Sequence, residues 1–296
     1  MTHIARSAVL ATLLLCLAEV GWAQDGRSCS SASLAGAWGY IETGTVVTPA
    51  GPVPGAAVGR YDFDAAGGFS GTQYSSVGGN LAQDTKLGAY TVNPDCTGTL
   101  TLSVYDPTGR LLRSSVWAFV LTDKAMQLRG TMTSLMLPNG MRLAPIMSMT
   151  AARMFPGQGG QTCSNVPGTW GYSWTATFIL PTGPAPATAV GRMSVDAAGE
   201  LTGTQSVSVG GQIGEDTFVG TANVNPDCTG TMTVRAYDQA GALRRTVEWA
   251  MVYVDGATEG RAMFKSLTLP DGTAIPLVGT AIARSIFPGR SDGQDQ

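Results

Sequence analysis

Apolar and polar residues alternate along most of the chain, in segments rich in Thr, Val, Tyr and Ser. Alternate side chains of a strand face the same side, so this pattern predicts strands with one buried face. Clusters of Asp, Asn, Pro and Gly interrupt the first half at residues 49–55, 64–68, 77–80, 93–98, 106–109, 122–124 and 138–140. Such clusters favour tight turns between neighbouring strands. The first half is therefore predicted to contain eight antiparallel strands and no long helix.

The second half of the chain repeats the first at a spacing of 132 residues. The Trp-Gly-Tyr motif at 38–40 recurs at 170–172, and the Asn-Pro-Asp-Cys-Thr-Gly-Thr segment at 93–99 recurs at 225–231. Solenoid repeats run to about 20 to 50 residues, so this longer period indicates a duplicated domain. We expect copy one at 29–156, a linker at 157–162, copy two at 163–288 and a polar tail at 289–296.

The pattern predicts two tandem, antiparallel, up-and-down, eight-stranded β-barrels. Closing a sheet into a barrel removes the edge strands that a sandwich has to protect. The interior of such a barrel is filled by side chains or holds one small ligand. A single sixteen-stranded porin is the alternative, but it would need aromatic girdles and a lipid-facing band, whereas aromatic residues are only 7% of the chain.

Several short motifs follow one another in each copy. In copy one they are Val-Gly-Arg, Phe-Asp, Gly-Thr-Gln, Val-Gly-Gly and Val-Asn-Pro-Asp-Cys-Thr-Gly-Thr, which ends at Thr99. Over about residues 38–101 and 170–233 this order resembles a group of secreted bacterial proteins of uncharacterised function. The eight-strand plan is similar to allene oxide cyclase-like and lipocalin-like barrels. That similarity implies a ligand-sized cavity, but it assigns no catalytic residue and no substrate.

The N-terminus has the features of a secretory signal peptide at residues 1–23. Arg6 precedes a short apolar run at 8–18, and small residues near Ala23 suit cleavage. The run is shorter than the ~20 residues that a spanning helix needs. We therefore expect a secreted or periplasmic protein without a membrane span.

The four cysteines of the mature chain fall two in each copy. An exported chain with an even number of cysteines is expected to pair them. Pairing within each copy is favoured over the other connectivities, because each copy could then have closed its own bridge before the duplication. The expected disulfides are Cys29–Cys96 and Cys163–Cys228.

Composition disfavours several classes of function. Charged residues are 13% of the chain and the net charge is -3, so no basic surface for nucleic acid is predicted. The single histidine, His3, lies in the predicted signal peptide. This disfavours Ser-His-Asp hydrolase chemistry and histidine-ligated zinc. We expect no metal and no cofactor, and whether the protein is an enzyme stays open.

Residues on the predicted inner face are the candidate ligand contacts. An apolar pocket with a few orienting polar groups is typical of small-molecule sites. The candidates are Trp38, Tyr40, Gln73 and Tyr90 in copy one, and Trp170, Tyr172, Trp174 and Gln205 in copy two. Glu42 and Tyr40 are the candidates for proton transfer.

One strand in each copy is apolar on both faces, although a barrel strand needs only one buried face. The second face is predicted to pack against the other copy or a second subunit. It comprises Trp117, Phe119, Leu121, Trp249, Met251 and Tyr253.

Three functions remain open at the level of sequence. The first is a binding protein that holds a small apolar molecule inside one or both barrels. The second is a cofactor-free isomerase or cyclase of the allene oxide cyclase-like type, in which Glu42 or Tyr40 assists proton transfer. The third is a structural surface protein with filled barrels.

Overall fold

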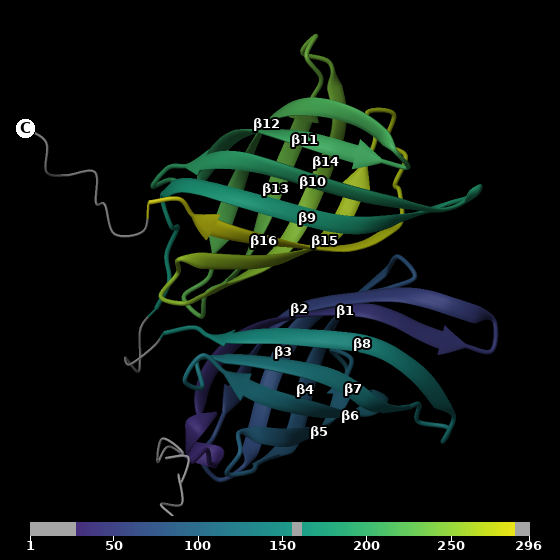
Figure 1. The fold of residues 1–296 in the computed structure, drawn as a ribbon. Coiled ribbons are helices and arrows are strands. Elements are labelled where there is room, and N and C mark those ends of the chain that lie inside the picture. Colours follow the sequence, from purple (N-terminus) through teal and green to yellow (C-terminus); the bar gives the residue numbers. More distant parts are fainter. Residues whose placement is uncertain (1–27, 156–161, 288–296) are drawn as a thin grey trace, which may run out of the picture.

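The structure, a computed structural model, describes residues 28–155 and 162–287 as two closed antiparallel barrels (Figure 1). Barrel one consists of β1(Gly36–Thr48), β2(Gly51–Phe63), β3(Gly68–Val77), β4(Asn80–Val92), β5(Thr97–Tyr105), β6(Leu111–Thr122), β7(Gln127–Met136) and β8(Arg142–Arg153). Barrel two consists of β9(Gly168–Leu180), β10(Gly183–Val195), β11(Glu200–Val209), β12(Gln212–Val224), β13(Thr229–Tyr237), β14(Leu243–Val254), β15(Glu259–Thr268) and β16(Leu277–Ser285). A short 3-10 helix, η1(Ser31–Ser33), precedes β1.

Each strand pairs with its neighbours in sequence, and each barrel is closed by its first and last strands, β1 with β8 and β9 with β16. The predicted fold class is confirmed, and the alternative of one sixteen-stranded barrel is wrong. The predicted signal peptide (1–23), most of the linker (157–162) and the tail (289–296) lie outside the described residues.

Alternation places the apolar side chains inside, as strand β5 illustrates. Leu100, Leu102 and Val104 are buried, whereas Thr99 and Thr101, which alternate with them, are exposed. Burying an apolar side chain of this size stabilises the fold by about 1.5–3 kcal/mol relative to leaving it in water. The alternation therefore fixes which face of each strand turns inward.

The first turn is shorter than the predicted break at 49–55. Strand β1 extends to Thr48, and β2 already begins at Gly51. Pro52 and Pro54 pair only with β1, because β3 joins β2 from Gly55 onward. Proline is accepted where no second strand needs its missing N–H.

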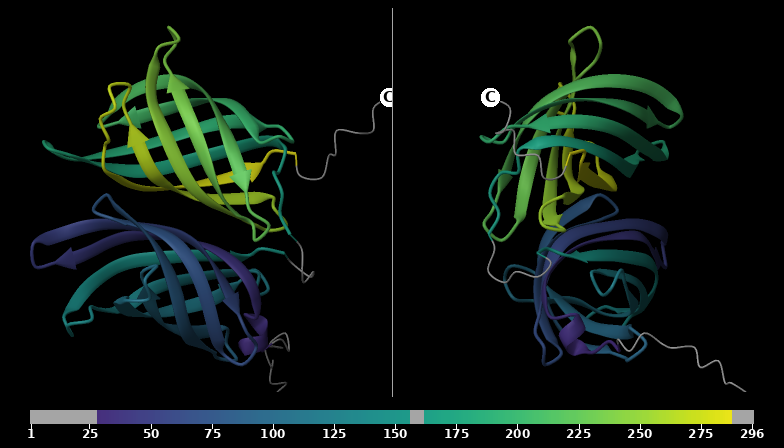
Figure 2. Two further views of the ribbon diagram at one scale, coloured as in Figure 1. Left: turned by 180° about the vertical axis from the view of Figure 1, so that it is seen from behind. Right: turned by 60° about the vertical axis from the view of Figure 1, so that its left-hand side comes forward.

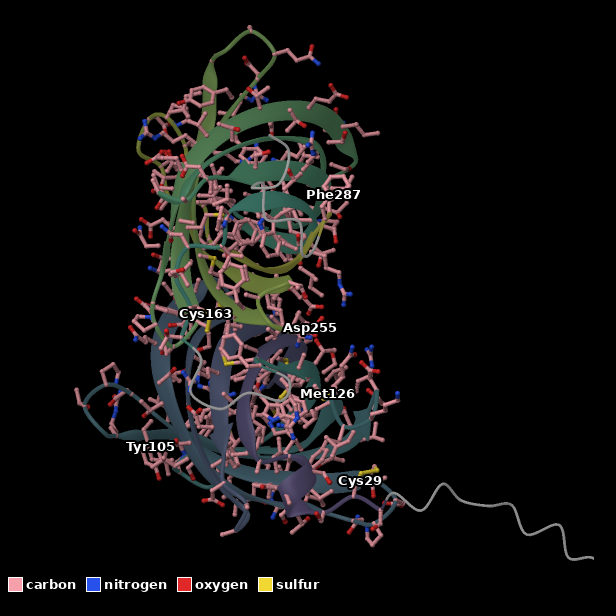
Figure 3. All side chains as sticks on the ribbon, turned by 90° about the vertical axis from the view of Figure 1, so that its left-hand side faces the viewer. Cys29, Tyr105, Met126, Cys163, Asp255 and Phe287 are labelled. Carbon is pink, nitrogen blue, oxygen red and sulfur yellow. A yellow bond between two sulfur atoms is a disulfide. The ribbon has the colours of Figure 1, made fainter. Side chains whose placement is uncertain are left out.

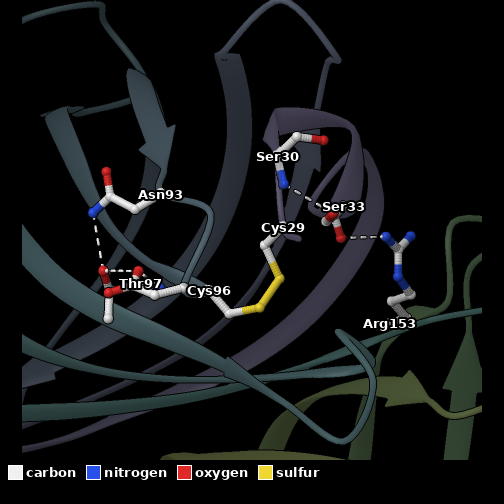
Figure 4. Close-up of a disulfide and its surroundings, with 8 residues drawn as sticks. Cys29, Ser30, Ser33, Asn93, Cys96, Thr97 and Arg153 are labelled. Atoms are coloured by element: carbon white, nitrogen blue, oxygen red, sulfur yellow. Dashed lines mark hydrogen bonds between the residues drawn. A yellow bond between two sulfur atoms is a disulfide. The ribbon is translucent and has the colours of Figure 1, made fainter. Parts of the chain in front are cut away.

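Each copy contains one disulfide, Cys29–Cys96 or Cys163–Cys228, and in both the Cα atoms are 4.9 Å apart. Each bridge ties the segment before the first strand of its barrel to the turn before the fifth (Figure 4; Cys29 and Cys163 are also labelled in Figure 3). A loop of this length contributes about 4 kcal/mol in the chain-entropy account. Cys96 and Cys228 both adopt φ 67°, so the two turns have the same conformation.

The barrels pack against each other through unlike faces. The outer face of β1–β3 in barrel one meets β14–β16 of barrel two, as the views of Figure 2 also show. Ile41 and Val58 join a buried cluster that contains Val252, Val254 and Met263. These side chains make the contact between the copies largely apolar.

Hydrogen bonds also cross this contact. Arg261 Nη1 donates to Thr150 O at 2.7 Å, and Ser76 Oγ donates to Leu277 O at 3.1 Å. The backbone N–H of Asp255 donates to Arg153 O at 2.8 Å. The contact is therefore specific in register as well as apolar.

The predicted contact surface between the copies is wrong. Its six residues point into the barrels: three lie in the core of barrel one, and the other three line the interior of barrel two, namely Trp117, Phe119, Leu121, Trp249, Met251 and Tyr253. The opposite face of β14, with Val252 and Val254, meets the other copy. Small branched side chains let the two sheets approach closely at Gly39, while the larger side chains fill the interior volume.

Among the described residues, no helix combines the length and hydropathy needed to cross a membrane.

Candidate functional site

Barrel two encloses a cavity of about 80 Å³. One water needs roughly 10–15 Å³ on this scale, so the cavity has room for more than one. Four of the predicted ligand residues line it: Trp170, Tyr172, Trp174 and Gln205. The remaining wall is mostly apolar and includes Met193, Val195, Phe218, Ala222, Met232, Trp249, Met251 and Ala281.

A partly buried polar network borders the cavity around Gln205. Tyr172 Oη and Trp174 Nε1 donate to Gln205 Oε1 at 3.0 and 3.2 Å. Gln205 Nε2 donates to Asp216 Oδ2 at 3.0 Å, and Arg245 forms an ion pair with the same oxygen. Burial raises the pKa of Tyr172 above its ordinary value, so this hydroxyl stays protonated and acts as a donor.

The same network is present in barrel one, at matched positions of the duplication. Tyr40 Oη donates to Gln73 Oε1 at 3.2 Å, and Gln73 Nε2 donates to Asp84 Oδ2 at 2.8 Å. Arg113 pairs with Asp84 at 3.3 Å. Since both copies keep this arrangement, we interpret it as part of the barrel scaffold, which holds Gln73 or Gln205 in one orientation.

Barrel one contains a second polar cluster that barrel two lacks. Lys86 Nζ lies 2.6 Å from Glu42 Oε1 and 2.9 Å from Tyr61 Oη, and it is 4.7 Å from the centre of the Tyr40 ring. Burial lowers the pKa of Lys86, and the adjacent Glu42 carboxylate opposes that effect. Burial also raises the pKa values of Tyr40 and Tyr61 well above their ordinary range. Of the two candidates for proton transfer, Glu42 is thus bonded to Lys86 and Tyr61, whereas Tyr40 stacks on Tyr61 and donates its hydroxyl to Gln73.

Barrel two has corresponding apolar residues at the charged positions. Trp174 stands at the position of Glu42, and Phe218 stands at that of Lys86. The ion pair of barrel one is therefore replaced by two aromatic side chains.

Smaller side chains in barrel two account for its cavity. At five matched interior positions barrel one has the larger residue; the pairs are Tyr61 and Met193, Phe63 and Val195, Tyr90 and Ala222, Leu128 and Gly260, and Met149 and Ala281. Unfilled volume remains where the barrel backbone is kept but the side chains shrink.

Tyr90 contacts the N-terminal segment of its own copy. Its hydroxyl lies 2.9 Å from Ser31 O in η1 and also contacts Asp64 O. The Tyr90 side chain is therefore bonded to η1, which lies beside the disulfide (Figure 4).

Five charged residues of these networks were not singled out from the sequence: Asp84, Lys86, Arg113, Asp216 and Arg245. Asp84 and Lys86 share the inward parity of Tyr90 on β4, so the alternation did contain a signal. Charged residues are almost never fully buried without partners. Here Gln73 lies opposite Asp84 on the neighbouring strand, whereas Glu42, the partner of Lys86, comes from a distant strand. Parity alone does not reveal those partners.

No family model and no curated protein sequence matches this chain. Among solved structures, an AttH candidate from Nitrosomonas europaea aligns at 10% identity and TM-score 0.29, covering 84% of this chain and 92% of the other. A DUF3598 family protein of unknown function from Nostoc punctiforme aligns at 12% identity and TM-score 0.25, covering 86% and 97%. A double mutant of transferrin-binding protein B from Haemophilus parasuis aligns at 8% identity and TM-score 0.30, covering 84% and 75%. At TM-scores this low, the similarities transfer neither residue roles nor ligands to this chain.

Proposed function

We propose that the protein is an exported binding protein that holds one small apolar molecule inside barrel two. The observation that carries this proposal is the cavity of about 80 Å³ in barrel two, with its largely apolar wall and the few polar groups around Gln205. An apolar cavity with a small number of convergent polar groups is the usual form of a small-molecule site.

The size of the cavity limits the guest. An engineered apolar cavity of roughly 150 Å³ binds benzene. The cavity of about 80 Å³ is smaller, so it suits a short chain as it stands, and a six-membered ring enters when the wall moves outward. Met193, Met232 and Met251 line the cavity. Methionine side chains adapt to irregular shapes, so these three would adjust the volume to the guest.

Export is supported by the two disulfides and by the features of the N-terminal segment. Disulfides persist in secreted and periplasmic proteins and are rare in the reducing cytosol. Cleavage near Ala23 would leave both disulfide-bonded copies in the mature chain.

An acid-base cyclase has less support. Glu42 and Tyr40 lie in the buried cluster of barrel one, where Glu42 is paired with Lys86. The cavity lies in barrel two, where Trp174 replaces the carboxylate.

The test is to fill the cavity. Ala281→Met introduces the residue that barrel one has at this position, Met149, and Ile282→Met places the same side chain on the outer face of the same strand. We expect calorimetric titration to show methylenecyclohexane binding to the wild-type chain and to the outer-face control. In Ala281→Met the affinity should fall at least about tenfold, because the added side chain takes the volume of the guest.

Absence of binding to the wild-type chain, or equal affinity in Ala281→Met, would show that the cavity is not the binding site. A filled structural barrel would give the first of these results. Native mass spectrometry of the protein isolated from its own host should in addition detect a retained small molecule.

A further inference from the structure

One buried donor in the wall of the cavity has no partner in the protein. Trp170 is 1% exposed and lines the cavity, yet its indole Nε1 has no hydrogen-bond acceptor. An unpaired buried N–H group is costly, so native proteins almost always satisfy such groups with protein, water or ligand atoms.

The matched tryptophan of barrel one shows how the donor is satisfied there. Trp38 Nε1 donates to Leu34 O at 2.8 Å, and Leu34 is the fully buried residue that follows η1. The stretch from Cys163 to Trp170 is two residues shorter than the stretch from Cys29 to Trp38. Val166 stands four residues before Trp170, as Leu34 does before Trp38, but residues 162–167 contain no helix and the indole finds no acceptor there.

The free volume opens at the same end of the barrel as the unpaired donor. In barrel one Phe63 and Tyr90 fill this end, and the Phe63 ring packs at 6.4 Å from the Trp38 ring. Val195 and Ala222 stand at these positions in barrel two, and both line the cavity. The lost acceptor and the lost side-chain volume therefore coincide.

The charge of the wall constrains the occupant. Among the residues that line the cavity, Arg245 is the only charged one, and it is already paired with Asp216. A charged guest would lose its hydration without gaining a free counter-charge. The wall therefore favours a neutral molecule.

We propose that Trp170 is the residue that orients the guest: its indole N–H donates to an acceptor oxygen of a neutral, largely apolar ligand, of the class of small ketones, esters or ethers. This inference rests on the proposed function, because it concerns the same cavity. The apolar wall would hold the body of the ligand, and Trp170 would select molecules that place an oxygen at this end.

Two probes of equal size separate the hydrogen bond from apolar burial. Cyclohexanone and methylenecyclohexane have the same ring, and they differ in an oxygen acceptor against a methylene group. Trp170→Phe keeps an aromatic side chain and removes the donor. We expect this variant to weaken cyclohexanone binding about three- to tenfold relative to methylenecyclohexane, the range of one hydrogen bond.

Trp38→Phe is the matched control, because it removes the equivalent donor of barrel one and leaves the cavity unchanged. The ratio of the two affinities should stay at the wild-type value in this variant. Equal weakening of both probes by Trp170→Phe, or no change in their ratio, would overturn the proposed hydrogen bond.

Nuclear magnetic resonance of the wild-type chain provides a measurement that does not depend on a variant. The indole proton of Trp170 should move downfield with cyclohexanone and should not do so with methylenecyclohexane. If methylenecyclohexane binds but cyclohexanone does not shift the indole proton of Trp170, the inference fails while the proposed function stands. If neither probe binds, the proposed function fails and the inference fails with it.

Discussion

Barrel one and barrel two have the same order of eight strands and the same Tyr-Gln-Asp-Arg network, but their interiors differ in side-chain volume and in charge. Barrel one holds large side chains and a buried ion pair between Glu42 and Lys86. Barrel two replaces the ion pair with Trp174 and Phe218 and leaves a cavity. The comparison indicates that closure of an eight-stranded barrel does not depend on one particular filling.

The two interiors also suggest that the barrels have different roles. A buried ion pair costs desolvation, and it is kept only where its geometry is good and its remaining hydrogen bonds are made. Lys86 meets that condition through Glu42 and Tyr61. We interpret barrel one as the structural unit with a filled interior, and we propose that barrel two is the unit that binds the ligand.

The largest expected effect comes from breaking the ion pair of barrel one. Lys86→Met leaves Glu42 buried without its counter-charge, so we expect a loss of about 3–5 kcal/mol in the free energy of unfolding. Denaturant titration measures it. Adding Glu42→Leu to Lys86→Met should recover at least about 2 kcal/mol, because the orphaned charge is then removed. A loss below about 1 kcal/mol in the single variant would contradict the contrast drawn between the barrels.

A smaller effect is expected where the barrels touch. A Cβ at Gly39 would lie 2.5 Å from Val254 Cγ1, whereas a Cβ at the matched Gly171 would come no closer than 3.7 Å to Ile286. We expect Gly39→Ala to cost about 1–3 kcal/mol of unfolding free energy by overpacking. Gly171→Ala should stay within about 0.5 kcal/mol of the wild type. If thermal or denaturant unfolding shows that both variants lose the same unfolding free energy, the packing of unlike faces does not hold the barrels together.

The smallest effect concerns alkaline pH and barrel two. Burial raises the pKa of Tyr253 to about 12 from an ordinary value of 10.0. A group whose pKa is raised in the folded state keeps its proton there while the unfolded chain loses it, so stability falls as pH rises from 10 towards 12. Tyr253→Phe removes this contribution. Between pH 8 and pH 11, the variant should lose about 1.4 kcal/mol less unfolding free energy than the wild type. Identical losses would mean that Tyr253 titrates normally.

Much of the fold was predictable because its signals are local. Alternation and turn residues indicate antiparallel strands, and the 132-residue repeat indicates two equal units. The predicted first break is too long, because Pro52 and Pro54 belong to strand β2. They come before the residues of β2 that pair with β3, so no strand on that side needs the N–H group that proline lacks. The identity of the cavity-bearing copy was not predicted, because it depends on the summed volumes of residues from all eight strands.

The predicted contact surface between the copies is the clearest error. Strand β14 is apolar on both faces, and the larger side chains of Trp249 and Tyr253 were assigned to the outer face. Hydropathy does not distinguish two apolar faces, whereas interior volume and close approach do. The large residues belong in the hollow of the barrel, and Val252 and Val254 belong opposite Gly39.

The packing of unlike faces has a consequence for assembly. A heterologous contact leaves one complementary face free at each end, and such contacts can repeat into open fibres. The free faces of this chain are polar at three of the corresponding positions: Ser173 matches Ile41, Thr122 matches Val254 and Thr131 matches Met263. Val190 and Val120 keep the valines of Val58 and Val252 and are exposed. Polar groups at these positions would be buried without partners if a third barrel added to the row. These three polar residues therefore weaken the contact that a third barrel would make through the same faces.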